Sequence, residues 1–219
     1  MSVRKVIVLC DFDGTITTCN TMDFLYENYA TCGLKYVKEW EAGKLSTMEE
    51  EELSFSCIHA SREELEQALD ANIILDPDAG ALVDYCRAHA FGFAVLSEGQ
   101  TWYIHHLLAK HKLIVDKVYG SEVTFNPDGT YFMAYPYFDP RFPMRGTAKA
   151  TIIENYKKAG YFTIFIGDGK SDTDAVKAAD KVYAKSHLLD YCLNHQIPVE
   201  GFEDFKGLLQ LWAEQSPAT

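Results

Sequence analysis

Apolar residues follow two patterns along this chain, short continuous runs and helical spacing. The short runs lie at 6–10, 91–96, 162–166 and 181–184. A strand that is apolar on both sides is covered on both faces, as in a parallel sheet. Because helical stretches precede the second and third runs, the pattern predicts βαβ units and an α/β fold with a three-layer, Rossmann-like parallel sheet core.

A helical insertion follows the first run. Between about Asn20 and Leu75 the sequence shows helical spacing and no strand pattern. The predicted helices are 22–30, 34–41, 47–55 and 65–69. We therefore expect an α/β core formed by residues 1–18 and 76–219, with an inserted helical cap at 19–75.

Two further patterns occur after the second run. Between Lys117 and Phe138 the residues alternate around Asn126-Pro-Asp-Gly129, a sequence with turn chemistry, which predicts a small antiparallel β-hairpin. Apolar residues at helical spacing from Gly201 to Trp212 predict a C-terminal helix.

The chain is acidic. Its 219 residues include 20 Lys and Arg against 32 Asp and Glu, for a formal net charge of −12. This charge disfavours broad attraction to nucleic acid or anionic lipid. No apolar run approaches the ~20 residues that cross a bilayer. We therefore expect neither a nucleic-acid nor a membrane partner, and an acidic protein that binds an anion needs a compensating cation.

Six cysteines are scattered along the chain without a Cys-x-x-Cys pair. A chain of this length can form a full core without disulfides. The N-terminus shows no export signal, because an acidic cluster follows the first apolar run at once. We therefore expect reduced thiols and a cytoplasmic location. The sequence leaves open whether the chain is a monomer or a homodimer.

The strongest chemical signal is Asp11-Phe12-Asp13-Gly14-Thr15, directly after the first run. Residues two apart on an extended chain project to the same side, so both carboxylates are expected together at the carboxyl edge of the sheet. Mg²⁺, which prefers oxygen ligands, would offset their repulsion. One Asp can then act as a nucleophile and the other as an acid and base. A calcium loop is excluded because Met22 stands where its Glu is required.

A second acidic cluster, Gly167-Asp168-Gly169-Lys170-Ser171-Asp172, follows the third run. It is not a nucleotide motif: Ile164 stands where a P-loop needs Gly, and Asp172 stands where the dinucleotide fingerprint needs its third Gly. Two acids four apart in a turn suit a metal, with Asp168 ligating directly and Asp172 holding a coordinated water.

Two polar residues complete the pattern. Ser97 ends the second run, and Lys149 opens a predicted helix at 148–158. Taken alone, each is a helix cap or a solvated surface residue. At the same sheet edge as the acids, a hydroxyl and an ammonium group would bind phosphoryl oxygens and stabilise the charge that develops during transfer.

These motifs, in this order, resemble the haloacid dehalogenase superfamily of aspartyl-phosphate phosphatases. They are Asp11-x-Asp13-x-Thr15, Ser97, Lys149 and Gly167-Asp168-x-x-x-Asp172. The helical insertion is similar to the phosphoserine phosphatase-like branch. Further segments look like the group around the methionine-salvage phosphatase for 2-hydroxy-3-keto-5-methylthiopentenyl 1-phosphate. They are Pro136-Tyr-Phe-Asp-Pro140, Tyr191-Cys192, Ile197-Pro198 and Phe202-Glu-Asp-Phe205.

The resemblance implies a Mg²⁺-dependent phosphomonoester hydrolase that acts on a small phosphorylated metabolite. Asp11 would be the phosphorylated nucleophile and a metal ligand. Asp13 would be the acid and base, with its backbone carbonyl on the metal. Asp168 would complete the protein ligands of Mg²⁺, and Asp172 would support the metal through water.

The resemblance also implies a phosphate site. Ser97, Lys149 and the backbone amides of Phe12, Asp13 and Glu98 would hold the phosphate. Relatives often carry Gly where this chain has Glu98, and a carboxylate there would repel a phosphate. We therefore expect only the amide of Glu98 to face the phosphate.

Rival functions stay open at this point. The same residues suit a phosphotransferase or phosphomutase, and Glu98 leaves room for a non-catalytic sensor of a phosphorylated ligand. Asn20 stands where phosphoserine phosphatases usually carry a Glu that holds the substrate ammonium, which counts against phosphoserine. The sequence does not determine the substrate.

Overall fold

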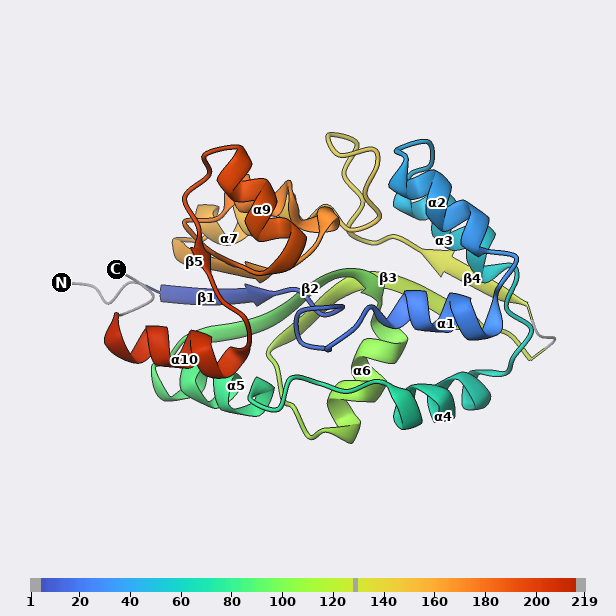
Figure 1. Ribbon diagram of the computed structural model, residues 1–219, viewed down its shortest axis with the longest axis horizontal. Helices are drawn as coiled ribbons and strands as arrows, with labels where there is room; N and C mark the ends of the chain where they lie inside the picture. The colour runs from blue at the N-terminus through green and yellow to red at the C-terminus, as the bar shows by residue number, and fades with distance from the viewer. Residues whose placement is uncertain (1–4, 128–129, 216–219) are drawn as a thin grey trace.

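The structure, a computed structural model, describes residues 5–127 and 130–215 of the chain. Within these residues, strands form one sheet in the order β4-β3-β2-β1-β5-β6-β7 (Figure 1). The strands are β1 (Lys5–Cys10), β2 (Gly92–Gln100), β3 (Lys117–Phe125), β4 (Tyr131–Ala134), β5 (Tyr161–Gly167), β6 (Lys181–Ala184) and β7 (Glu200–Gly201). All neighbours pair in parallel except β3 and β4.

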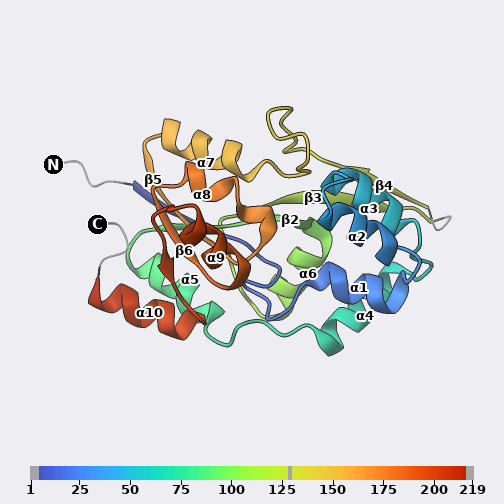
Figure 2. The same cartoon turned by 45° about the horizontal axis from the view of Figure 1, so that its top comes forward.

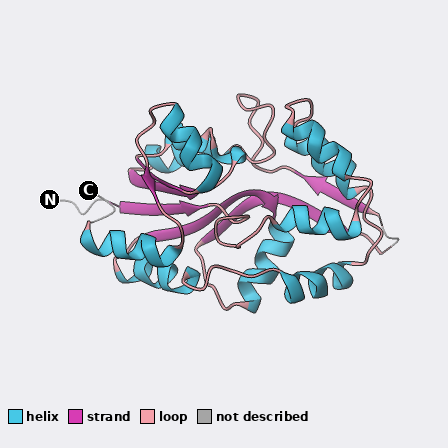
Figure 3. Cartoon of the chain, in the orientation of Figure 1, coloured by secondary structure: helices cyan, strands magenta, loops and turns pink. Residues whose placement is uncertain are grey.

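Helices cover both faces of this sheet (Figures 1 and 3). The helices are α1 (Thr21–Tyr29), α2 (Leu34–Glu41), α3 (Thr47–Phe55), α4 (Arg62–Asn72), α5 (Ala79–Ala88), α6 (Thr101–Lys110), α7 (Lys149–Lys158), α8 (Ala175–Ala178), α9 (Ser186–Asn194) and α10 (Phe205–Glu214). The apolar cores place α5, α6 and α10 on one face and α7, α8 and α9 on the other. The predicted three-layer α/β fold is confirmed.

Strand β1 shows why the continuous apolar run forms a central strand. Val6, Val8 and Cys10 belong to the core beneath α5, α6 and α10. Ile7 and Leu9 belong to the core beneath α7, α8 and α9. Because alternate side chains point to opposite faces, a strand covered on both faces needs apolar residues at every position.

The order in which strands are added to the sheet reverses at β1. The chain continues from β1 to β2 and β3 on one side, while β5, β6 and β7 lie on the other side. In open α/β sheets, ligand sites form outside the carboxyl ends of the strands at such a switch point. The residues that follow β1 and β5 are therefore placed at the natural position for a site.

Helices α1 to α4 follow one another between β1 and α5, as the sequence predicts. They lie at the end of the molecule toward which β1 points (Figures 1 and 2). Helix α3 packs against the β3–β4 hairpin, since the ring of Phe55 lies 6.0 Å from that of Phe125 and 4.8 Å from that of Tyr131. Helix α4 contacts α6 instead, through a 2.9 Å contact between His106 Nε2 and Asp70 Oδ1.

The predicted hairpin is present, with a difference. Strand β3 pairs in parallel with β2 through its first half and in antiparallel with β4 through its second half. It is therefore part of the core sheet as well as of the hairpin. Of the predicted turn, Asp128 and Gly129 lie outside the described residues.

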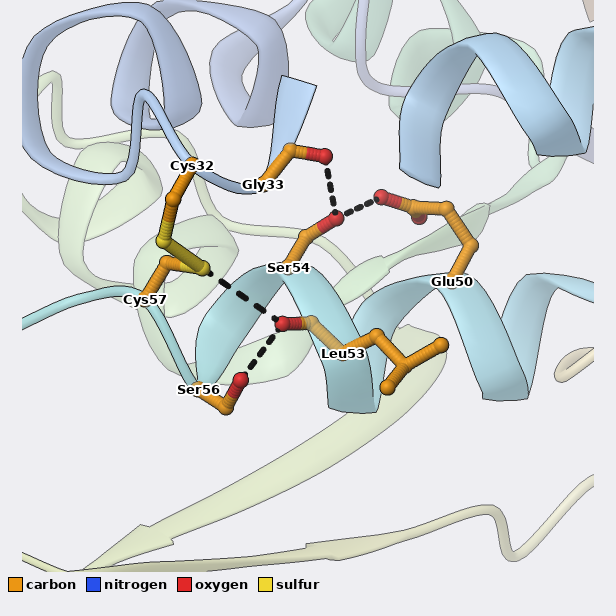
Figure 4. Close-up of a disulfide and its surroundings, with 7 residues drawn as sticks. All are labelled: Cys32, Gly33, Glu50, Leu53, Ser54, Ser56 and Cys57. Atoms are coloured by element: carbon orange, nitrogen blue, oxygen red, sulfur yellow. Dashed lines mark hydrogen bonds between the residues drawn. A yellow bond between two sulfur atoms is a disulfide. The ribbon is translucent and has the colours of Figure 1, made fainter. Parts of the chain in front are cut away.

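The expectation of reduced thiols is wrong for one pair of cysteines. Cys32 and Cys57, 25 residues apart, form a disulfide with a Cα to Cα distance of 5.9 Å (Figure 4). Packing of α2 against α3 brings Cys32, two residues before α2, next to Cys57, two residues after α3, a proximity that no local motif encodes. Cys10, Cys19, Cys86 and Cys192 are free thiols. The disulfide removes part of the basis for a cytoplasmic location, which stays a prediction.

No helix within the described residues has the length and apolar character needed to cross a bilayer.

Candidate active site

Asp11 lies at the centre of the sheet edge. Its backbone amide donates to the carbonyl of Ile166 at 2.8 Å, which continues the pairing of β1 with β5. Asp11 is only 4% exposed. Burial and the nearby Asp172 raise the pKa of Asp11 well above its usual range, while Lys149 opposes this effect.

Lys149 joins the two acidic clusters. Its ammonium nitrogen lies 2.9 Å from Asp11 Oδ1 and 2.6 Å from Asp172 Oδ1. The side chain is almost fully buried, and it enters the site because Lys149 begins α7. Burial alone would lower the pKa of Lys149, but the two carboxylates raise it above its ordinary value. Lys149 is therefore a fixed positive charge beside Asp11.

Asp168 and Asp172 have different partners. Asp172 accepts hydrogen bonds from the backbone amides of Asp168 and Gly169, each at 3.1 Å, in addition to that from Lys149. Asp168 accepts one from the hydroxyl of Thr15 at 2.7 Å. Burial raises the pKa of Asp168 to about 6, the bond from Thr15 opposes this shift, and the charge of Asp172 adds to it. Asp172 therefore orders its loop, while Asp168 keeps acceptor capacity.

Asp13 is positioned separately from the other acids. Its carboxylate accepts hydrogen bonds from the amide of Thr21 at 3.0 Å and from the hydroxyl of Tyr103 at 2.5 Å. The chain enters a turn after Phe12. The extended geometry assumed from the sequence therefore does not continue to Asp13. Burial raises the pKa of Asp13, and the bonds from Thr21 and Tyr103 oppose the shift.

Two glycines make room for these carboxylates. Gly14 has a φ of +75°, and a Cβ there would lie 2.5 Å from Asp168 Oδ2. A Cβ on Gly99 would lie 1.8 Å from the hydroxyl oxygen of Tyr103 and 2.6 Å from Asp13 Oδ2. A side chain at either position would displace an acid, so glycine is required at both.

The predicted phosphate-binding residues differ in placement. Ser97 lies within β2 and not at its end. The pairing of β2 with β3 becomes irregular between Leu96 and Gln100, the stretch that contains Ser97. The hydroxyl of Ser97 accepts a hydrogen bond from the backbone amide of Gly99 at 2.9 Å. The amide of Phe12 donates to Asp11 Oδ1 at 2.8 Å. The carboxylate of Glu98 accepts a bond from Gly146 N at 3.2 Å, which directs it toward the loop before α7.

A cavity of about 380 Å³ opens above these residues. Its walls come from the sheet edge and from α1, α2 and α3. The residues of the sheet edge that line it include Asp11, Asp13, Ser97, Glu98 and Asp168, and those of the helices include Met22, Asp23, Tyr26, Trp40, Glu50 and Glu51. Lys149 and Phe12 are not among the described residues that line it.

The acidic group fits a divalent cation. Asp11, Asp168 and Asp172 each offer a carboxylate oxygen, and these oxygens lie within 4.8 Å of one another. Lys149 supplies a single positive charge to this group. Carboxylate oxygens at this density are the ligand type that Mg²⁺ prefers. Asp13 is not part of the group, so its carboxylate is available for another role.

Some residues of the site were not assigned a role from the sequence. Tyr103 and Gly99 position Asp13, and Thr15 positions Asp168. Thr15 stands within the motif itself. Tyr103 carried only a weak signal, an aromatic residue six positions after Ser97, which fits packing in the core equally well. Glu50 and Glu51 carried none, because an acidic run on a helix usually faces solvent.

Comparison with known proteins assigns the class of protein. The family model described as haloacid dehalogenase-like hydrolase matches residues 8–177. The chain belongs to this family.

Proteins that align with nearly the full length of this chain show which members of the family it resembles. The chain is 26% identical to Pdp3-interacting factor 1 of Schizosaccharomyces pombe over 215 residues, covering 92% of each chain. It is 27% identical over 218 residues to the 2-hydroxy-3-keto-5-methylthiopentenyl-1-phosphate phosphatase of Brevibacillus brevis, covering 95% of each chain. The Bacillus cytotoxicus protein of the same name is 26% identical, with coverage of 92% and 93%.

Solved structures share the fold. A phospho-aspartyl intermediate analogue of phosphoserine phosphatase aligns with a TM-score of 0.72 at 20% identity, covering 95% of this chain and 99% of the other. A substrate-bound phosphoserine phosphatase aligns with a TM-score of 0.73 at 20% identity, covering 96% and 99%. The predicted resemblance to this branch is confirmed, and the chain is an enzyme, a phosphoric monoester hydrolase.

Proposed function

We propose that this enzyme hydrolyses a small phosphorylated metabolite with Mg²⁺, through an aspartyl phosphate on Asp11. The observation that carries the proposal is the position of Asp11. Its carboxylate lines the cavity, pairs with the buried ammonium of Lys149 at 2.9 Å, and belongs to the acidic group with Asp168 and Asp172. The two bacterial relatives described above are named as phosphatases for a phosphorylated metabolite, which agrees with this class of substrate.

Asp11 performs the first step. A carboxylate oxygen of Asp11 forms a bond to phosphorus while the bond from phosphorus to the ester oxygen breaks. The raised pKa of Asp13 favours its protonated form, and Asp13 gives that proton to the departing oxygen. Tyr103 and Thr21 hold Asp13 in place for this transfer.

Asp13 also serves the second step. Water attacks the phosphorus of the aspartyl phosphate and gives its proton to the carboxylate of Asp13, and the bond between phosphorus and the oxygen of Asp11 breaks. Inorganic phosphate leaves, and both aspartates return to their starting forms. Ser97, the amide of Glu98 and Lys149 would hold the phosphoryl oxygens during both steps.

The metal site is assigned to the acidic group. Asp11, Asp168 and the backbone carbonyl of Asp13 would hold Mg²⁺, with Asp172 acting through water. When bound, Mg²⁺ supplies the positive charge that allows an acidic site to accept a phosphate dianion. Without the metal, the single positive charge of Lys149 does not balance the negative charges of Asp11, Asp168 and Asp172.

We also propose a division of the chain into two functional parts. Residues 1–18 and 76–219 form the catalytic core, and residues 19–75 form a cap over the cavity. The contacts of Phe55 with Phe125 and Tyr131 support adding the outer part of the β3–β4 hairpin to this cap.

Replacement of the nucleophile tests the mechanism. With Mg²⁺ and p-nitrophenyl phosphate, we expect Asp11→Asn to lose at least about 10³-fold in kcat. Asp84→Asn, which changes an exposed carboxylate on α5, serves as the matched control and should keep wild-type activity. Normal hydrolysis by Asp11→Asn would show the mechanism to be wrong. Transfer of phosphate to added alcohols instead of release would indicate a phosphotransferase, and tight binding without turnover would indicate a sensor.

A further inference from the structure

The wall of the cavity that lies on the helices is acidic, and its two glutamates are buried. This distal wall consists of Tyr26 from α1, Trp40 from α2, and Glu50 and Glu51 from α3. Glu50 is 7% exposed and Glu51 is 4% exposed. Asp23 also lines the cavity and carries a third carboxylate from the helices. These residues line the same cavity as Asp11, Asp13 and Ser97.

The carboxylates from the helices that line the cavity have no positively charged partner within the described residues. None of the ion pairs within the described residues includes Asp23, Glu50 or Glu51. Lys170 lines the same cavity, but its ammonium donates to the carbonyl of Glu41 at 2.5 Å and lies over the ring of Trp40. Buried carboxylates without a counter-charge are costly, and a bound cation would remove that cost.

A second, independent observation points to a ligand at this wall. Tyr26 lines the cavity, and its hydroxyl has no hydrogen-bond partner within the described part of the chain, although the residue is only 2% exposed. Buried hydroxyl groups are normally hydrogen-bonded. A group bound between Tyr26 and the two glutamates would supply the missing partner.

The hydrogen bonds around Glu50 favour a protonated carboxyl group when no cation is bound. The hydroxyl of Ser54 lies 2.7 Å from Glu50 Oε1 and 3.2 Å from the carbonyl oxygen of Gly33 (Figure 4). A hydroxyl has one proton, so it can donate to only one of these two acceptors. Both contacts are satisfied when Glu50 is protonated and donates to Ser54. Burial raises the pKa of Glu50 to about 7, which agrees with this arrangement in the absence of a cation.

We propose that the distal wall binds a positively charged amine of the substrate, so that the substrate is a phosphate monoester of an amino alcohol. This proposal rests on the phosphatase function proposed above. The phosphate end would face Asp11 and Asp13, and the ammonium end would face Glu50 and Glu51. A carboxylate on the same substrate is disfavoured, because the single lysine that lines the described cavity is engaged elsewhere.

A matched set of three compounds tests the substrate class. 2-Aminoethyl phosphate, 2-hydroxyethyl phosphate and phosphoglycolate differ mainly in whether the distal end is an ammonium, a hydroxyl or a carboxylate. We expect kcat/KM with Mg²⁺ to be at least about tenfold higher for the aminoethyl than for the hydroxyethyl compound, and lowest for phosphoglycolate. A ratio of one or less between the first two would overturn the proposal.

Substitutions on α3 test the assignment to the distal wall. Glu50→Gln and, separately, Glu51→Gln should each lower the ratio of kcat/KM for aminoethyl to hydroxyethyl phosphate by about fivefold or more. Glu52→Gln removes the same charge from an exposed position on the same helix and should leave the ratio unchanged. Equal ratios in wild type, Glu50→Gln and Glu51→Gln would also overturn the proposal.

A binding measurement separates this proposal from the phosphatase function. If p-nitrophenyl phosphate is not hydrolysed with Mg²⁺, the proposed function fails and no ratio of kcat/KM exists. Calorimetric titration of the wild type with the aminoethyl and hydroxyethyl compounds needs no turnover. Tighter binding of the aminoethyl compound, reduced in Glu50→Gln but not in Glu52→Gln, supports the amine site in either case. Equal binding of the two compounds rejects it.

Discussion

At the residue scale, the acids of this site differ through their partners more than through their spacing. Asp11 is paired with the ammonium of Lys149, whereas Asp13 is bonded to the neutral groups of Tyr103 and Thr21. A cation favours the ionised form of its partner, and burial favours the protonated form. Burial raises the pKa of both carboxyls, and the contact with Lys149 favours the ionised form that the proposed nucleophile, Asp11, requires.

Removal of the Tyr103 hydroxyl should change the titration of Asp13. The hydrogen bond from Tyr103 favours the ionised form of Asp13, so Tyr103→Phe should raise the pKa of Asp13 further. Because the first step needs protonated Asp13, we expect the alkaline limb of the kcat/KM profile to move to higher pH, with kcat reduced about tenfold. Steady-state kinetics from pH 5 to 9 measure this shift. An unmoved limb would mean that Tyr103 has only a structural role.

Glu50 should make the stability of the unliganded protein dependent on pH. Its pKa is about 7 in the folded protein, above the ordinary value of 4.5, so between these values the folded state binds more protons than the unfolded state. The contribution of Glu50 to the free energy of unfolding is therefore fully present below about pH 4.5, and it is lost as the pH rises through 7.

Glu50→Gln removes this dependence. From pH 5 to pH 8, the free energy of unfolding of the variant should rise relative to wild type by up to about 3 kcal/mol. Urea unfolding at several pH values measures the difference. Parallel pH curves for the two proteins would contradict the prediction.

At the scale of elements, the cavity depends on how α2 and α3 are held together. The disulfide joins Cys32, just before α2, to Cys57, just after α3, and Ser54 of α3 contacts the carbonyl of Gly33 (Figure 4). These two connections hold the helices that carry Trp40 and Glu50. The distal wall is therefore built on a covalently braced pair of helices.

Loss of this disulfide should destabilise the protein. The closed segment of 25 residues corresponds to about 3.5 kcal/mol in the chain-entropy account. We expect Cys32→Ser to lower the free energy of unfolding by about this amount in urea without reductant. Cys19→Ser, which changes an exposed free thiol, is the control and should have little effect. Equal stability of wild type and Cys32→Ser would show that the disulfide does not form in solution.

At the scale of the whole molecule, the net charge of −12 does not prevent phosphate binding, because its distribution matters more than its sum. Three carboxylates gather at the sheet edge, and one ammonium pairs with two of them. A further group of carboxylates from the helices lines the same cavity. In the proposed function, the first group would hold Mg²⁺ and the second would bind a cationic group of the substrate.

Mg²⁺ should therefore stabilise the folded protein. Binding to the folded state alone at 100-fold excess over Kd contributes about 2.7 kcal/mol, which for a chain of this length raises the Tm by about 5 to 10 °C. Differential scanning fluorimetry with Mg²⁺ and with a chelator measures the shift. Asp168→Asn should lose the response, and an equal response in that variant would place the metal elsewhere.

Local sequence patterns determine most elements of this protein. The helices at 34–41 and 47–55 and the strand at 181–184 have the predicted bounds, because binary pattern and capping are local properties. The sequence also predicts that Asp11 and Asp168 meet, since parallel strands bring their carboxyl ends to one edge.

Tertiary structure decided the rest. Tyr103 reaches Asp13 across 90 residues, and Cys32 pairs with Cys57 only because α2 packs against α3. Glu50 and Glu51 belong to an acidic run that would be solvated on an isolated helix. They face the cavity because α3 packs against the hairpin and against the core. The sequence by itself determined which acids meet at the sheet edge, because that meeting follows from the order of the strands. Packing of the helices, which joins segments far apart in the chain, determined that Glu50 and Glu51 line the cavity.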